Sequence, residues 1–210
     1  MRKHLSRVMA VLLVLAMALT MLPVVSAAKE RFTATPIDGI PESGQTFVIY
    51  SVPAGGVFSP EASGGAVGVS AASGSEESAN LTVQTGAGAY QAVKNADGTY
   101  YLTCGGQYLT VDSAEKLTFE NEPKSGSSMS SKWKIADAGK DYDGFSIASA
   151  EVKYNNYEIF LEFYTAFKAW TYKPNSDWSI YVFRFFSVDG TADPDNDGYI
   201  GTRPEAGGPP

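Results

Sequence analysis

The stretch DGTYYLTCGGQYLTVD (97–112) alternates turn residues with aromatic and β-branched side chains. Asp-Gly and Gly-Gly favour two-residue hairpin turns, and the apolar runs beside them are typical of short strands. A looser version of the same pattern, DGFSIASAEVKYNNYEIFLEFY (143–164), follows later in the chain. An internal echo of this kind indicates that one structural unit has been copied along the sequence.

Three aromatic residues mark the copies. Phe47, Tyr90 and Trp133 each begin a strand-like run, and they are spaced 43 residues apart both times. A hairpin followed by a second pair of short strands takes about forty residues and cannot bury its inner face alone, whereas three such units together can. The sequence therefore predicts a β-trefoil-like closed barrel built from three repeats. A β-sandwich or an irregular β-barrel is the alternative.

Other strand signals extend over the same region, and no ten-residue helical pattern with caps follows residue 28. The protein is therefore predicted to be all β. The last run, 181–186, is expected to pair with the first, 46–50. The Ser/Ala/Gly-rich stretch 59–80 is expected to form an inserted surface loop. Strand-like runs are found at 46–50, 99–102, 108–111, 132–135, 145–147, 160–164 and 181–186.

The chain is expected to divide into four parts. Residues 1–28 have a basic start, an apolar run from Val8 to Leu19 and a small-residue site, the features of a secretory signal peptide. An uncleaved membrane anchor is the alternative. A polar lead (29–45), an all-β domain (46–188) and an acidic Gly/Pro-rich linker or tail (189–210) follow. The product is predicted to be secreted.

Composition narrows the possible functions. Removal of residues 1–28 leaves 13 basic and 23 acidic side chains, a net charge of −10, which argues against binding of nucleic acid or of a membrane surface. His4 is the sole histidine and is lost with the signal peptide, which excludes histidine-based nucleophilic or zinc sites. Cys104 lies in a strand-like run, so a buried thiol is expected there rather than a reactive one.

The strongest binding candidate is an aromatic loop tip at 170–178. Trp170, Tyr172 and Trp178 could stack on sugar rings, while Asn175 and Asp177 accept hydrogen bonds from hydroxyl groups. Alternation along a strand places Trp170 and Tyr172 on one face. Packing of these rings beneath the loop or in the open end of the barrel is the alternative.

Acidic residues suggest two further sites. Glu158 and Glu162, with Asp141 and Asp143, could supply the two carboxylates of a glycosidase, but the Asp143-Gly144 pair is explained as a turn. No catalytic residue and no required cofactor are therefore predicted.

In the tail, Asp193, Asp195 and Asp197 match the opening of a calcium-binding loop. Pro204 stands at the closing position, where such a loop carries a bidentate glutamate. A weak calcium site and a merely acidic tail both remain open.

Three segments, 46–50, 95–100 with 107–109, and 160–164, resemble a β-rich module that stands directly after the signal peptide of large secreted phosphoesterases. These are 5′-nucleotidase-type and related extracellular nuclease proteins of Gram-positive bacteria. The resemblance covers roughly residues 40–190, and the Asp-Gly-Thr-Tyr motif is also similar to that of ricin-type lectin trefoils. It implies an accessory module in front of a catalytic domain. The expected function is non-catalytic binding of glycan or cell-wall material, or docking beside that domain; the alternative is an N-terminal fragment of the phosphoesterase itself.

Overall fold

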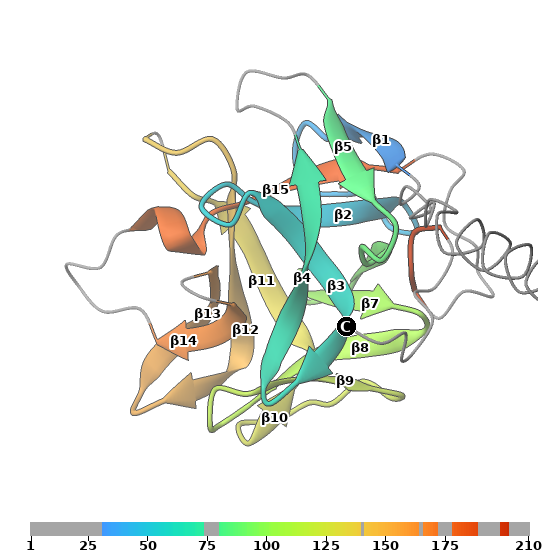
Figure 1. Ribbon diagram of the computed structural model, residues 1–210. Helices are drawn as coiled ribbons and strands as arrows, with labels where there is room; N and C mark the ends of the chain where they lie inside the picture. Colours follow the sequence, from blue (N-terminus) through green and yellow to red (C-terminus); the bar gives the residue numbers. More distant parts are fainter. Residues whose placement is uncertain are drawn as a thin grey trace, which may run out of the picture.

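The computed structural model describes residues 31–73, 80–139, 141–163, 166–171, 178–188 and 198–201, and this part of the chain is all β (Figure 1). The prediction of an all-β protein is confirmed, because the described residues contain antiparallel strands and a single short 3₁₀ turn, η1. The elements are β1 (Arg31–Pro36), β2 (Thr46–Ser51), β3 (Gly56–Ser63), β4 (Ala66–Ser73), β5 (Leu81–Gln84), β6 (Tyr90–Lys94), β7 (Tyr100–Cys104), β8 (Gln107–Asp112), β9 (Leu117–Glu120), β10 (Met129–Ser130), β11 (Lys132–Asp137), β12 (Phe145–Tyr154), β13 (Tyr157–Phe163), β14 (Phe167–Thr171), η1 (Trp178–Tyr181) and β15 (Phe183–Ser187).

Six strands form a series of pairings that returns to its first member. β2 pairs with β6, β6 with β7, β7 with β11, β11 with β12, β12 with β15, and β15 with β2. The predicted pairing of the last strand with the first is therefore confirmed. The run predicted at 181–186 begins later than expected, because residues 178–181 form η1 and the strand starts at Phe183.

Three hairpins lie outside this series and contact one another. β14 pairs with β4 at one residue pair, and the Leu117 amide of β9 donates to the Gly65 carbonyl in the β3–β4 turn at 3.0 Å. On the β8–β9 turn, the Glu115 carboxylate accepts the backbone N–H of Thr171 at 2.8 Å and also the Thr171 hydroxyl. These contacts bring the β3–β4, β8–β9 and β13–β14 hairpins together.

Tight turns set the register of the strands around them. The residue pairs 64–65, 105–106 and 155–156 join β3 to β4, β7 to β8 and β12 to β13, and all six residues have positive φ. Two successive positive φ values define the type I′ turn, whose twist matches that of paired strands. Glycine and asparagine are the residues that adopt this conformation most readily, so these turns follow directly from the sequence.

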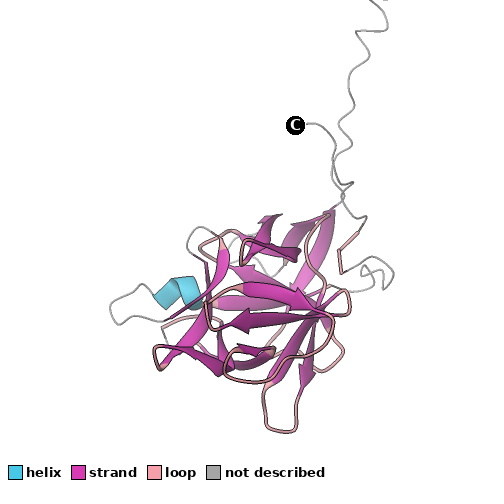
Figure 2. Ribbon diagram, turned by 90° about the horizontal axis from the view of Figure 1, so that it is seen from below, coloured by secondary structure: helices cyan, strands magenta, loops and turns pink. Residues whose placement is uncertain are grey.

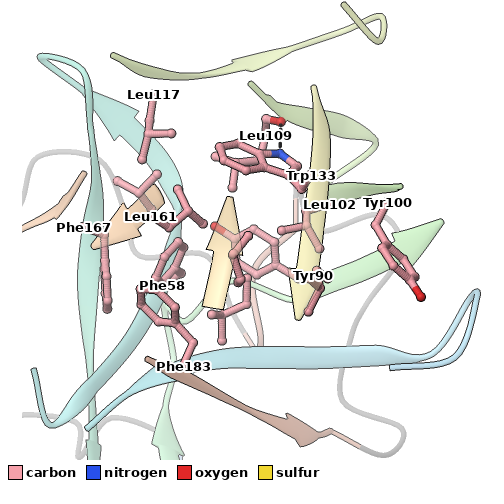
Figure 3. Close-up of a cluster of buried hydrophobic side chains, with 14 of the residues drawn as sticks. Phe58, Tyr90, Tyr100, Leu102, Leu109, Leu117, Trp133, Leu161, Phe167 and Phe183 are labelled. Carbon is pink, nitrogen blue, oxygen red and sulfur yellow. Dashed lines mark hydrogen bonds between the residues drawn. The ribbon is translucent and has the colours of Figure 1, made fainter. Parts of the chain in front are cut away.

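The three marker rings share one apolar core, in which Figure 3 shows Tyr90 and Trp133. Phe47, Tyr90 and Trp133 are fully buried in the same cluster of side chains. The polar side-chain atoms of Trp133 and Tyr90 form hydrogen bonds: Trp133 Nε1 donates to the Leu109 carbonyl at 2.9 Å, and the Tyr90 hydroxyl donates to the Ser59 carbonyl at 2.7 Å. Burial of rings this large supplies much of the apolar area that stabilises the fold.

A second, smaller core includes segments that were expected to lie outside the domain. Ala34 on β1 and Ile200 near the end of the chain are fully buried, and Ile200 N donates to the Ala87 carbonyl at 2.8 Å. β1 also pairs with β5 and β15. The predicted polar lead and tail thus each contribute a packed segment. One or two apolar residues, such as Phe32 with Ala34 or Tyr199 with Ile200, form too short a pattern to predict this packing.

The prediction of a surface loop over 59–80 is wrong for most of that range. Residues up to 63 belong to β3, and residues 66–73 form β4, which pairs with β3, β5 and β14. Val67 is buried in the main core. Small residues suffice in β4 because Gly68 lies close against β3: a Cβ there would come within 2.9 Å of Ser59 Oγ. This strand was not predicted because the stretch contains few large apolar residues.

Candidate ligand-binding site

An open cleft of about 350 Å³ lies where three segments distant in the sequence meet. The β2–β3 turn contributes Val52, the β11–β12 loop contributes residues 141–143, and the η1–β15 segment contributes Ser179, Val182 and Arg184. The lining combines two carboxylates, a guanidinium, a hydroxyl and a tyrosine ring with two valines. A few convergent polar groups on a partly apolar wall are typical of sites for small polar ligands.

One wall of the cleft is an oriented ion pair. Arg184 Nη2 lies 3.5 Å from Asp143 Oδ2, and the guanidinium carbon lies 5.3 Å from the centroid of the Phe186 ring. Gly144 allows the loop to approach β15, since a Cβ there would lie 2.5 Å from the Phe183 carbonyl oxygen. The Asp143 side chain is 87% exposed and that of Arg184 is 19% exposed. Such an exposed pair is weak, so both groups remain able to bind a ligand.

Another part of the lining comes from η1, whose first and last residues are held by contacts with other elements. Trp178 Nε1 donates to the Ala138 carbonyl at 3.1 Å, which ties η1 to the end of the β11–β12 loop. The Trp178 and Tyr181 rings pack against Phe160 of β13, with centroids at 5.5 and 5.9 Å. Ser179 is held between these anchors and faces the cleft. Figure 2 shows this short helical turn at the edge of the strands.

Exposed aromatic rings are concentrated in one part of the chain. Tyr142, Tyr154, Tyr157 and Trp170 are 38%, 43%, 60% and 41% exposed. The other large apolar side chains exposed among the described residues are Val69 and Val93, both aliphatic. All four rings thus lie between residues 142 and 170. One of them, Tyr142, lines the cleft.

The predicted aromatic tip is divided in the structure. Trp170 is an exposed residue of β14, opposite Phe160. Trp178 is partly buried in η1, in the packing role that was the alternative for this residue. Tyr172, Asn175 and Asp177 lie outside the described residues.

The carboxylates considered for a glycosidase have separate partners. Glu158 Oε1 lies 3.4 Å from Lys134 Nζ on the surface. Glu162 is buried, and its burial raises the pKa of the carboxyl group, while a hydrogen bond from Tyr181 and the nearby Lys168 charge oppose the rise. Asp141 and Asp143 belong instead to the cleft.

Neither a metal centre nor a reactive thiol is found in the described part of the chain. It contains no group of three His, Cys, Asp or Glu side chains able to hold a metal ion, and Asp193, Asp195 and Asp197 lie outside it. Cys104 is buried, and burial raises the pKa of its thiol to about 12. Its Sγ lies 3.3 Å from the Gly198 carbonyl oxygen.

Sequence reasoning missed most of the cleft. Asp143 was explained fully by its turn, and Tyr142, Ser179 and Arg184 were not considered as ligand-binding residues. One signal was present: Arg184 interrupts the apolar run of β15 between Phe183 and Phe185. A charge in such a strand must face outward, but its partner across the cleft depends on the fold.

No helix in the described ranges is long and apolar enough to cross a membrane. Comparison with known proteins gives no relative: no family model, no curated protein and no solved structure matches this chain.

Proposed function

We propose that the protein is a non-catalytic, secreted β-module that binds carbohydrate, as glycan or cell-wall material, in the cleft formed by residues 52, 141–143 and 179–184. The main support is the set of groups on its walls: the exposed Tyr142 ring beside the Asp143–Arg184 pair and the Ser179 hydroxyl. A carboxylate accepts and a guanidinium donates hydrogen bonds, so together they match vicinal sugar hydroxyls. The aromatic ring offers an apolar face for the C–H side of a sugar ring.

The architecture that we propose is a β-trefoil. Three features support it: the six-strand series that returns to β2, the three hairpins in mutual contact, and the shared core of Phe47, Tyr90 and Trp133. In such a fold the six strands make a barrel and the hairpins cover one end of it. A closed arrangement leaves few unpaired strand edges, which protects an exported protein from aggregation.

The wider context rests on the sequence. The basic and apolar start of the chain supports export, and the net charge of −10 after its removal disfavours nucleic acid and anionic membranes as partners. The second candidate is the N-terminal part of a secreted 5′-nucleotidase-type phosphoesterase, supported by the resemblance of the strand motifs. In that case the module would dock beside a catalytic domain. Calcium bound by Asp193, Asp195 and Asp197 would stiffen the connection.

Retention on insoluble polysaccharides tests the binding function. The purified protein is mixed with cellulose, xylan, chitin and cell-wall material, and bound and free fractions are compared. Tyr142→Ala removes one stacking ring and is expected to weaken retention about two- to tenfold, because such a contact contributes about 0.5–1.5 kcal/mol. Asp143→Ala removes the carboxylate that would accept hydrogen bonds from sugar hydroxyls and is likewise expected to weaken retention.

Tyr157→Ala is the matched control, since it removes an equally large exposed ring that does not line the cleft. Equal retention of the wild-type protein and of both cleft variants would refute the site. Failure of the wild-type protein to bind any of these polysaccharides would refute the function.

A further inference from the structure

A strip of aromatic side chains leads out of the cleft along the outer face of the β13–β14 hairpin. We define this aromatic strip as Trp178, Phe160 and Trp170. It begins next to Ser179, which lines the cleft. The Trp178 and Phe160 ring centroids are 5.5 Å apart, and Phe160 stands directly opposite Trp170 in the β13–β14 ladder. Side chains directly opposite each other in an antiparallel pair lie on the same face and in contact range.

The aromatic strip is held rigidly. Five consecutive residue pairs align β13 with β14, which fixes the position of Trp170 relative to Phe160. The hydrogen bond from Trp178 to the Ala138 carbonyl fixes the other end. Tyr181 packs against both Trp178 and Phe160 and donates to the buried Glu162. A surface that is already ordered loses little entropy when it binds a ligand.

Three properties of the strip define its ligand. Trp178 and Phe160 contact each other edge to face, with centroids 5.5 Å apart, and Trp170, which is 41% exposed, stands opposite Phe160 on β14. The first residue of the strip, Trp178, adjoins Ser179 of the cleft, and the cleft volume is at the small end of ligand sites, so a ligand must be elongated to touch both. The net charge of −10 for residues 29–210 disfavours polyanions. A protein partner would need about 800 Å² of complementary surface, more than a strip of three rings offers.

We propose that the ligand is an uncharged linear polysaccharide, with one sugar in the cleft and the following sugars along the aromatic strip as far as Trp170. This inference rests on the proposed carbohydrate-binding function and adds chain length as the property that is recognised. Short sugars occupy the cleft alone, whereas longer ones also reach Trp170. Affinity therefore rises with the number of sugars until the strip is covered.

Isothermal titration calorimetry with cello-, xylo- and chito-oligosaccharides, from disaccharide to hexasaccharide, tests this. In the wild-type protein the hexasaccharide of the preferred series is expected to bind at least tenfold more tightly than the disaccharide. Trp170→Ala is expected to remove most of that gain and leave disaccharide affinity unchanged, whereas Trp170→Phe retains much of it. Tyr142→Ala weakens the binding of all lengths equally.

Tyr154→Ala, an exposed ring outside both the cleft and the strip, is the control, and near-ultraviolet circular dichroism verifies that each variant is folded. Equal affinity for all lengths, or an equal effect of Trp170→Ala on every length, would overturn the inference while leaving the cleft as a site for short sugars. The absence of binding to any oligosaccharide or polysaccharide would overturn both proposals.

Discussion

Glu151 on β12 is the centre of a polar cluster that holds the β9–β10 connection to the domain. Its Oε2 accepts hydrogen bonds from Gly126 N at 2.9 Å and Ser130 Oγ at 2.7 Å. Its Oε1 accepts one from Ser125 Oγ at 2.9 Å and lies 3.1 Å from Lys132 Nζ. Because every partner donates, Glu151→Gln would lose the charge and turn an amide NH₂ toward donors. We predict that this nearly isosteric change destabilises the protein.

The size of the loss follows from the pKa. Burial raises the pKa of Glu151, but the hydrogen bonds from Ser130, Gly126, Ser125 and Lys132 outweigh burial and lower it from 4.5 to about 2. A difference of this size between folded and unfolded chains corresponds to about 3 kcal/mol of unfolding free energy at neutral pH. Partial exposure and solvent screening reduce the expected value to about 1–3 kcal/mol. Because the folded-state pKa is lowered, this stability is present above pH 4.5 and is lost as the pH falls toward 2.

Urea unfolding measured at pH 7 and at several values down to pH 2.5 checks the prediction. Glu151→Gln should be less stable than the wild-type protein by about 1–3 kcal/mol at pH 7, and the difference should shrink steadily below pH 4.5. Glu158→Gln is the matched control on β13, since its exposed ion pair with Lys134 should contribute less than about 1 kcal/mol. A difference that is absent at pH 7, or that is the same at every pH, would refute the role assigned to Glu151.

Three further changes have defined outcomes. Burial raises the pKa of Glu162, so its protonated carboxyl group is favoured in the folded protein; this stabilises folding below the unfolded-state pKa and is lost as the pH rises through the folded-state pKa. Glu162→Gln should therefore raise the melting temperature at pH 8 relative to the wild-type protein but not at pH 4. Gly198→Ala places a Cβ 2.5 Å from Gly105 N at a φ of +86°, and urea unfolding should show a loss of about 2 kcal/mol or more of unfolding free energy. Gly106→Ala is the control: a Cβ there meets no atom within 4 Å, so the loss should be about 1 kcal/mol. The Cys104 thiol, with its pKa raised to about 12, should stay unmodified by iodoacetamide at pH 8 in the folded protein and react only in urea; modification at equal rates in both states would contradict its burial.

Much of the fold could be predicted because its signals are local. Glycine and asparagine pairs mark the tight turns, and the aromatic residues at a constant interval mark the strands whose side chains meet in the core. What could not be predicted are strands without such signals. β4 is composed mainly of Ala, Ser, Gly and Val, and β1 has a single fully buried residue, Ala34. Both strands exist because neighbouring strands satisfy their backbone groups, which is a property of the assembled sheet.

Less of the site than of the fold could be predicted from the sequence, because the residues of the site are far apart along the chain. The sequence predicts Trp170 at a loop tip, with packing of its ring as the alternative; the structure places it on β14 with its side chain exposed. The cleft joins residues 52, 141–143 and 179–184, so no local pattern contains it. Trp178 illustrates the same limit: the sequence allowed both exposure and packing, and the choice depended on the presence of Phe160 beneath it.

Buried and exposed aromatic rings contribute differently to stability and to binding. Core rings such as Trp133 stabilise the fold because they leave water on folding, at about 25 cal/mol for each Å² of apolar area buried. Tyr142 and Trp170 keep over a third of their surface in contact with water and therefore realise only part of that energy in the folded state. The remainder becomes available when a ligand covers them. The stability of the folded domain therefore does not by itself account for these exposed rings. Burial of the apolar area that Tyr142 and Trp170 leave uncovered is therefore the source of free energy that we expect carbohydrate binding to use.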